Sequence, residues 1–334
     1  GGVVNRPPSS PTMLLSGHTR RRKVLAGLAG AVLAATHASG QARARVGWLT
    51  VAPHPGINGF RAGMRELGWV EGDTLAIEYA YAEDRPERLP ELAAALARGP
   101  VQLVVASGSD AVVAARAHIT AKPVVAVSTG AAVGVGENLA RPSGNLTGIS
   151  LMTDETAAKW VEVLVELLPS STRFGVVHDA SLTNREQFEN ARRAAATLRR
   201  EAISLEIESL DGLDAAIALA RREAVAGLIF VSSPVFTANA ARIVEAVRAS
   251  GLPAVYESRW LVEKGGLMAY GPDFNAVFRR AASLADRLLK GARPADLPIE
   301  QPTRFHFSLN RATARALGVE IPTSLLVRAD EVFE

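Results

Sequence analysis

The sequence predicts an α/β protein with two doubly wound, Rossmann-like domains, each built on a parallel sheet. Three observations carry this prediction. Short apolar runs rich in β-branched residues alternate with amphipathic helical patterns from Arg45 onward. The alternation restarts near Thr153, and 334 residues are enough for two separate cores. Repeated strand–helix units of this kind form parallel sheets with right-handed crossovers.

Residues 1–42 have the pattern of an export signal. The cationic patch Arg20-Arg21-Arg22-Lys23 precedes the apolar run Val24–Ala35, and small residues then lead to Gly40-Gln41-Ala42. The apolar run is shorter than the ~20 residues that a permanent membrane helix needs. Arg21–Leu25 resembles a twin-arginine motif, and an ordinary Sec leader is the alternative. We expect a signal peptide and leader over 1–42, and a periplasmic mature protein that is not embedded in the membrane.

The first domain begins with alternating strands and helices. Its helices are predicted from the face Phe60–Met64–Leu67, from Leu89–Leu92–Leu96, and from an Ala-rich stretch over about Asp110–Ile119. Continuous apolar runs indicate strands that are buried on both faces. The predicted strands are Val46–Thr50, Leu75–Tyr81, Leu103–Ala106 and Val124–Val127.

The second series opens with a helix over Thr153–Leu168, which carries Trp160 and Leu164 on one side. Further helices are predicted around Glu186–Arg200, Leu213–Glu223 and Ala238–Ala249. The predicted strands between them are Phe174–Val177, Leu205–Ile207, Leu228–Val231 and Ala254–Tyr256.

The C-terminal tail is too short for a third core. It contains a strand at Leu267–Tyr270, a helix over Phe274–Leu289, a strand near Phe305–Leu309 and a last helix. We expect it to complete both sheets, which assigns 43–148 with 272–300 to an N-terminal lobe and 149–271 with 301–334 to a C-terminal lobe. The hinge would then comprise several parallel segments. These segments are Thr147–Ser150, Ala269–Pro272 and Glu300–Arg304.

Charge and composition exclude several classes of function. The chain has a formal net charge of +3, but residues 1–42 hold five basic side chains and no acidic one. The remaining 32 basic and 34 acidic residues give about −2, so a basic footprint for nucleic acid is absent. The chain has no cysteine, which excludes structural disulfides, thiolate metal sites and cysteine nucleophiles.

Catalytic and cofactor motifs are not matched. Gly130, Gly134 and Gly136 follow a strand without the dinucleotide spacing, and Ser107–Asp110 does not satisfy G-x-S-x-G. Ser109 instead fits the cap of the following helix. No histidine pair has the spacing of metal ligands on a helix. We therefore predict no enzyme, no cofactor and no metal site.

The candidate site lies in the loops at the carboxyl ends of the strands, where open parallel sheets bind ligands. Hydroxyl groups and free N–H groups at helix starts suit a carboxylate, and Asp179 and Glu257 suit an ammonium group. The alternatives are that Asp179 caps a helix and that Glu257 pairs with Arg259 or another surface cation. The predicted ligand-binding residues are Ser107, Ser109, Ser128, Thr129, His178, Asp179, Asn184, Ser233, Glu257 and Tyr270.

Several separate motifs, in order along the chain, resemble a family of ABC transporter substrate-binding proteins. They are Arg65–Gly72, Leu139–Gly148, Gly265–Asp273, Ile299–Thr303 and Ile321–Glu331. The resemblance covers about Arg45 to Glu334. It implies the fold of type I periplasmic binding proteins, and some relatives bind aromatic amino acids such as tryptophan.

This chain departs from the family pattern in the loops of the candidate site. Gly108-Ser109-Asp110 replaces the usual Gly-Thr-Pro, Ala131-Ala132 replaces Asp-Pro, and Asp179-Ala180 replaces Asn-Pro. Ser233 stands where an Asp is usual. The ligand therefore cannot be carried over from the family.

The resemblance and the pattern together predict a monomeric solute-binding component of an ABC importer. It would bind a small polar solute, such as an amino acid or another carboxylate, between the lobes and then dock on a permease. Two alternatives are a doubly wound α/β enzyme and the ligand-sensing core of a regulator. The missing catalytic motifs oppose the first, and the leader and the slightly acidic body oppose the second.

Overall fold

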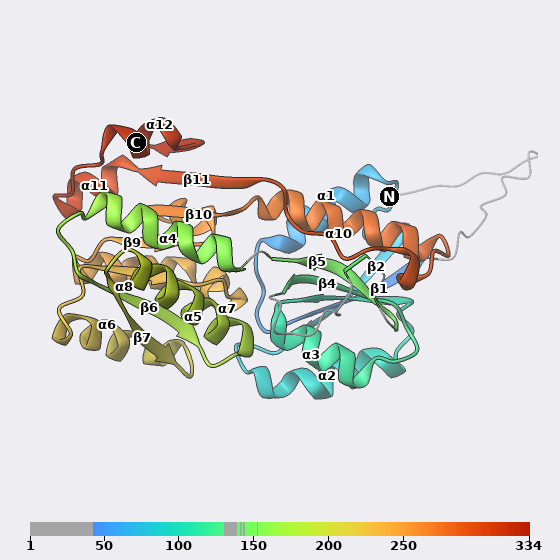
Figure 1. The fold of residues 1–334 in the computed structure, drawn as a ribbon. Helices are drawn as coiled ribbons and strands as arrows, with labels where there is room; N and C mark the ends of the chain where they lie inside the picture. The colour runs from blue at the N-terminus through green and yellow to red at the C-terminus, as the bar shows by residue number, and fades with distance from the viewer. Residues whose placement is uncertain (1–42, 130–138, 141, 143, 152) are drawn as a thin grey trace, which may run out of the picture. The chain divides into compact units, whose positions relative to one another are not determined.

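The structure is a computed structural model, and it describes residues 43–334 except 130–138, 141, 143 and 152. The predicted leader, the glycine-rich turn and Ala131-Ala132 lie outside the described residues. Two sheets organise the remainder, as the sequence predicts (Figure 1). Each sheet with its covering helices is called a lobe below.

The first lobe has a five-stranded parallel sheet of order β2-β1-β3-β4-β5. Its strands are β1 (Ala44–Thr50), β2 (Leu75–Tyr81), β3 (Leu103–Ser107), β4 (Val124–Thr129) and β5 (Leu146–Ser150). Neighbouring residues point to opposite faces of a strand. Val105 accordingly packs in one core with α1 (Gly56–Glu66), and Val104 in the other core with α2 (Leu89–Arg98) and α3 (Ser109–His118).

The second lobe has a seven-stranded sheet of order β12-β11-β10-β9-β8-β6-β7. Only the β10–β11 pair is antiparallel in the described sheet. The strands are β6 (Arg173–Asp179), β7 (Glu201–Ile207), β8 (Gly227–Phe230), β9 (Ala254–Tyr256), β10 (Met268–Pro272), β11 (Phe305–Asn310) and β12 (Glu331–Phe333).

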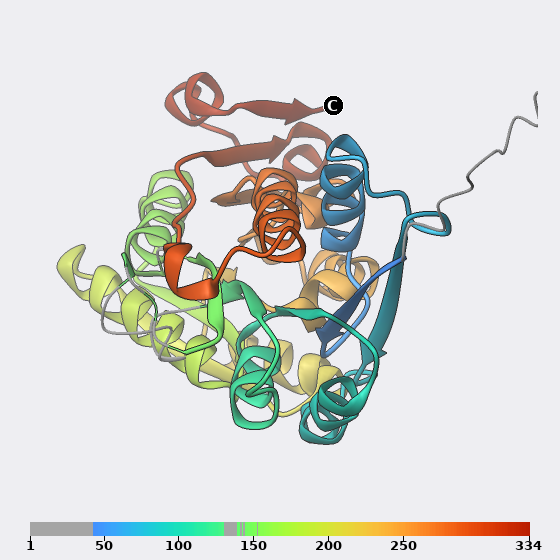
Figure 2. The same ribbon diagram turned by 90° about the vertical axis from the view of Figure 1, so that its right-hand side faces the viewer.

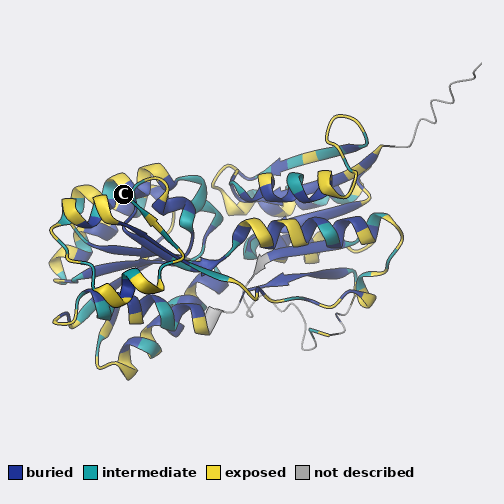
Figure 3. Cartoon of the chain, turned by 90° about the horizontal axis from the view of Figure 1, so that it is seen from above, coloured by how far each residue is buried: buried dark blue, intermediate teal, exposed yellow. Residues whose placement is uncertain are grey.

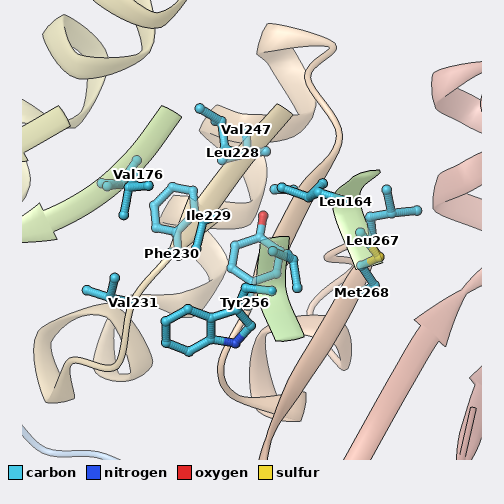
Figure 4. Close-up of a cluster of buried hydrophobic side chains, with 14 of the residues drawn as sticks. Leu164, Val176, Leu228, Ile229, Phe230, Val231, Val247, Tyr256, Leu267 and Met268 are labelled. Atoms are coloured by element: carbon cyan, nitrogen blue, oxygen red, sulfur yellow. The ribbon is translucent and has the colours of Figure 1, made fainter. Parts of the chain in front are cut away.

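Helices cover both faces of the second sheet. The helices α4 (Thr153–Leu167) and α5 (Leu182–Thr197) pack against each other, and α6 (Leu213–Arg222) packs against α8 (Ala240–Ser250). The shared core contains Leu164, Ile229, Tyr256 and Met268, which Figure 4 shows at close range. Figure 3 shows the inner strands buried beneath helices whose outer faces are exposed, whereas edge strands such as β2 and β12 keep partly exposed residues.

Several short elements of the structure are not predicted from the sequence. The predicted helix around Ala238–Ala249 corresponds to α8, whereas the short helix α7 (Pro234–Ala238), which precedes it across Asn239, is not predicted. The single predicted C-terminal helix is two short ones, α11 (Arg311–Leu317) and α12 (Thr323–Arg328), and β12 follows. Helix α9 (Arg259–Val262) is also unforeseen. Helices this short carry too little apolar periodicity to be seen in a sequence.

The helix α10 (Phe274–Leu289) links the two lobes. It follows β10 of the second sheet, yet it packs on α1 and shares the core of the first sheet. In Figure 2 α10 (orange) lies beside α1 (blue), although they come from distant parts of the chain. The close approach depends on small residues in α1, because a Cβ atom at Gly56 would lie 2.2 Å from the Phe278 ring.

Three segments carry the chain between the lobes, and they are hydrogen-bonded to one another. Ser150 N donates to Glu300 O at 2.9 Å, which joins the end of β5 to the segment before β11. Asp273 N donates to Arg304 O at 3.1 Å, which extends the β10–β11 pairing. Arg280 of α10 adds an ion pair to Glu300 at 2.6 Å. The backbone of all three segments is therefore paired.

Candidate functional site

One cavity lies at the carboxyl ends of both sheets, with a volume of about 270 Å³. The loops after β1 and β3 of the first sheet line it, and so do the loops after β6 and β8 of the second. These strand pairs are the switch points of the two sheets, where chain connections leave in opposite directions and ligands bind in open α/β sheets. The volume suits a small molecule.

His54 and Ser107 form a fixed hydrogen-bonded pair in the wall from the first lobe. His54 Nδ1 accepts from Gly56 N at 3.2 Å, so the ring proton is on Nε2, which donates to Ser107 Oγ at 3.0 Å. Burial lowers the pKa of His54 to about 4, which keeps the imidazole neutral at physiological pH. Ser107 is buried and lines the cavity, and its own proton is left to donate.

A second fixed pair lies in the wall from the second lobe. Ser232 N donates to Gln187 Oε1 at 3.0 Å, so the Gln187 amide nitrogen points the other way and donates to Asn184 Oδ1 at 3.2 Å. Asn184 lines the cavity with 3% of its surface exposed. Its side-chain amide nitrogen has no hydrogen-bond acceptor among the described residues. The two lobes therefore each offer an oriented neutral donor.

Two carboxyl groups from opposite lobes also line the cavity. Asp110 lies in the first turn of α3, and burial together with the charge of Asp179 raises its pKa to about 6. Asp179 is the last residue of β6, and it accepts from Ser181 N and from Ser233 Oγ, each at 3.0 Å. It thus forms a turn with Ser181, and Ser181 caps α5 in its place. These bonds fix the orientation of the Asp179 carboxyl group.

Aromatic rings form the apolar part of the wall. Phe236 of α7, Trp260 of α9, and Phe274 and Phe278 of α10 all line the cavity. Trp260 and Phe274 have ring centroids 5.6 Å apart. The site therefore combines a flat apolar surface with carboxylates and hydrogen-bond donors.

The two lobes touch directly beside the cavity. Ser109 Oγ donates to Thr183 Oγ1 of α5 at 2.6 Å. A Cβ atom at Gly108 would lie 2.7 Å from Pro234 of α7. The predicted capping role of Ser109 is wrong: Gly108, with φ +89°, is the residue before the helix, and Ser109 is its first residue.

The structure brings five of the predicted ligand-binding residues into the cavity wall, namely Ser107, Ser109, Asp179, Asn184 and Ser233. Two others lie outside it. His178 points to the opposite face of β6, where it bonds Ser204 and stacks on Phe188. Tyr270 stacks on Phe305 at a ring distance of 5.8 Å. Ser128 and Thr129 end β4, and their side chains lie outside the described residues.

Glu257 lies behind the wall and lines a smaller hollow that shares Ser232 and Ser233 with the cavity. Burial raises its pKa to about 8, so the carboxyl group is protonated at neutral pH. The alternative of a pair between Glu257 and Arg259 is not realised, because Arg259 pairs with Glu263 and Glu331. Glu257 is thus a neutral, buried group.

Some residues that line the site are not among the predicted ligand-binding residues. His54 falls in the loop after the first predicted strand, which is a recognisable signal. Asp110 lies in a predicted strand-end loop as well, but its pairing with a carboxylate on the other lobe depends on the tertiary structure. Gln187 and Trp260 lie on helices and carry no local signal.

In the part of the chain that the structure describes, no cluster of three or more His, Asp or Glu side chains is suited to a metal ion. Among the described helices, none is long and apolar enough to cross a bilayer.

Comparison with known proteins gives consistent matches. The family model of ABC transporter substrate-binding proteins matches residues 52–333. A tyrosine-binding protein of Clostridioides difficile is 22% identical over 288 residues, which is 82% of this chain and 81% of the relative.

Solved structures share the fold. A Streptococcus pneumoniae domain in complex with L-Trp has a TM-score of 0.77 at 22% identity, over 86% of this chain and 100% of that chain. A conserved domain protein of Vibrio cholerae has a TM-score of 0.80 at 20% identity, over 86% and 99% of the two chains.

Proposed function

This chain belongs to the family of ABC transporter substrate-binding proteins, and we propose that it is the exported solute-binding component of an ABC importer. It captures a small polar solute, such as an amino acid, in the cavity between its lobes and delivers it to a permease. The observation that carries the proposal is the cavity lined by the carboxyl ends of both sheets. A site built from two lobes can be opened and closed by one bending motion.

The wall chemistry supports a solute of this kind. Ser107 and Asn184 are hydrogen-bond donors whose orientation is fixed by their neighbours, and Asp110 and Asp179 accept from an ammonium group. The aromatic rings receive an apolar side chain. A tyrosine-binding relative and a neighbour in complex with L-Trp agree with an aromatic amino acid as one candidate.

We propose that the three crossing segments act as the hinge. Their mutual hydrogen bonds keep the lobes in register, while the few residues between the sheets absorb the bending. Closure removes water from the solute and strengthens its polar contacts. The leader over residues 1–42 supports export, and the solute-binding role needs no chemistry on the solute.

The test is a thermal-shift screen of amino acids and related polar solutes, followed by calorimetric titration. We expect a one-to-one complex with the solute that raises the melting temperature most. Ser107→Ala is expected to weaken its binding about tenfold, because a buried donor is lost.

Ser204→Ala is the matched control, because Ser204 bonds His178 outside the cavity. It is expected to leave affinity unchanged. Turnover of the solute by the purified protein, or equal binding by both variants, would contradict the proposed function.

A further inference from the structure

The cavity wall carries an excess of negative charge. Its acidic residues are Asp84, Asp110, Asp179 and Glu208, and no Lys or Arg lies among the described lining residues. Asp84 and Glu208 are exposed at the rim, whereas Asp110 and Asp179 are partly buried within. The one histidine of the described wall, His54, is neutral because burial lowers its pKa. The described wall therefore contains no cation to balance these carboxylates.

Asp110 and Asp179 come from different lobes and affect each other. Both carboxyl groups line the same cavity, and burial together with the charge of Asp179 raises the pKa of Asp110. Asp179 is held by the Ser181 amide and the Ser233 hydroxyl of its own lobe, so it does not turn away. Neither carboxylate has an ion-pair partner among the described residues. A positive group between them would replace this repulsion with two attractions.

The other wall groups fit a cation with an apolar body. Faces of Trp, Phe and Tyr rings attract ammonium groups, and Trp260, Phe274 and Phe278 line the same space. The donors on Ser107 and on the deeply buried Asn184 are neutral, so they can bind a hydroxyl, a carbonyl or a carboxylate. A bound zwitterion would leave the net negative charge of the site unchanged, whereas a bound cation would partly neutralise it.

We infer that the preferred solute is a compact organic cation of net positive charge, whose ammonium group binds between Asp110 and Asp179. This inference rests on the proposed function and narrows its solute class. Asp110 and Asp179 are then specificity-determining residues, one on each lobe. Because each lobe supplies one carboxylate, the cation also draws the lobes together when it binds.

The test compares solutes that differ in charge but share a body. Calorimetric titration at neutral pH and low salt is carried out with tyramine and L-tyrosine, and with tryptamine and L-tryptophan. We expect each amine to bind at least about tenfold more tightly than its amino acid, and its affinity to fall in high salt.

Variants separate the two carboxylates from general charge. Asp110→Asn and Asp179→Asn are each expected to weaken amine binding about tenfold. Amino-acid binding is expected to change less than about threefold, because each removed charge attracts the ammonium group of the amino acid but repels its carboxylate. The control is the double variant Asp214→Asn with Glu245→Gln, which removes two exposed carboxylates outside the cavity. Melting temperatures of all variants show whether they fold.

Each outcome decides the inference. Tighter binding of an amino acid than of its amine, or amine binding that is insensitive to Asp110→Asn and Asp179→Asn, overturns the cationic class while the solute-binding function stands. Binding of none of these compounds, together with no stabilising solute in the wider screen, overturns both. The same salt dependence in the wild type and in the two Asn variants also overturns the inference.

Discussion

His54 shows how one buried residue can set the chemistry of the site without being charged. It fits between a backbone donor and the Ser107 hydroxyl, and its ring also packs 5.4 Å from Phe278. Protonation of Nδ1 would place its N–H against the Gly56 N–H, and it would also place a positive charge in an apolar core. The residue therefore acts as a fixed, neutral support for Ser107.

Gly108 of the first lobe lies against Pro234 of the second. With φ +89° and Pro234 beside it, an added methyl group would both strain the turn and separate the lobes. We expect Gly108→Ala to weaken solute binding about tenfold, measured by calorimetric titration. Gly72→Ala is the control, because Gly72 has φ +96° and a methyl group added there would have no neighbouring atom within 4 Å. Equal affinity in the two variants would contradict a role for this contact in binding.

Glu257 gives the fold a pH dependence of known sign. Burial raises its pKa to about 8, above the value of 4.5 for an exposed carboxyl group. Its protonated form therefore stabilises the fold fully below pH 4.5, and this contribution is lost as the pH rises through about 8. When the pH is raised from about 5 to about 9, the wild type loses this contribution and Glu257→Gln does not. We therefore expect the unfolding free energy of Glu257→Gln, relative to that of the wild type, to rise by at least about 2 kcal/mol over this range.

Urea unfolding at the two pH values measures this difference. Glu245→Gln, at an exposed position of α8, controls for the loss of a carboxylate. Parallel stability curves for wild type and Glu257→Gln would show that Glu257 is ionised in the folded protein.

At the scale of elements, the packing of α1 against α10 joins two helices that are distant in the sequence. A Cβ atom at Gly63 would lie 2.8 Å from Ala282 Cβ and 3.0 Å from the Arg279 backbone. Because backbone atoms cannot shift at low energetic cost, the short distance between the axes of α1 and α10 requires a residue without a side chain at position 63. The aromatic wall of the cavity includes Phe274 and Phe278, so the position of α10 also sets the site.

Gly63→Leu is therefore expected to destabilise the protein by about 2 to 3 kcal/mol in urea unfolding. Arg65→Leu introduces the same side chain on the exposed face of α1 and is expected to change stability by less than about 0.5 kcal/mol. A similar cost for both variants would mean that the helix pair tolerates a wider separation.

At the scale of the whole described chain, the two lobes are joined by three paired segments and by contacts across the cavity. Ser109 and Thr183 make a direct side-chain link between the lobes, with their oxygens 2.6 Å apart. Two cysteine side chains at these positions would face each other, so that their sulfur atoms can approach to the ~2.05 Å of a disulfide bond. The chain contains no cysteine, so a designed pair would be its only disulfide.

We expect Ser109→Cys with Thr183→Cys to form that disulfide on oxidation and to lock the lobes together. Solute association and release are then expected to slow at least about tenfold, measured by stopped-flow fluorescence, and reduction restores both rates. Ser109→Cys alone is the control. Unchanged rates in the oxidised pair would show that the solute reaches the cavity without lobe separation.

The sequence predicts the fold closely but the site only in part. Buried strands such as Leu103–Ser107 can be predicted because a strand that is covered on both faces is a continuous apolar run. The end of such a run also marks the end of the strand, and residues at these ends include Ser107, Asp179 and Ser233 of the cavity wall. The prediction for His178 is wrong, because the position of a strand end does not show toward which face of the strand a side chain points.

Local pattern alone therefore determines two α/β sheets, most of the strands that compose them, and the edge at which the cavity lies. The tertiary structure decides which charges and rings share that edge. Asp110 and Asp179 come together because two separate sheets turn their carboxyl ends to one cavity, and Phe278 reaches it because α10 crosses to the other lobe. Periodicity follows from burial of neighbouring residues, whereas these contacts depend on how distant segments pack.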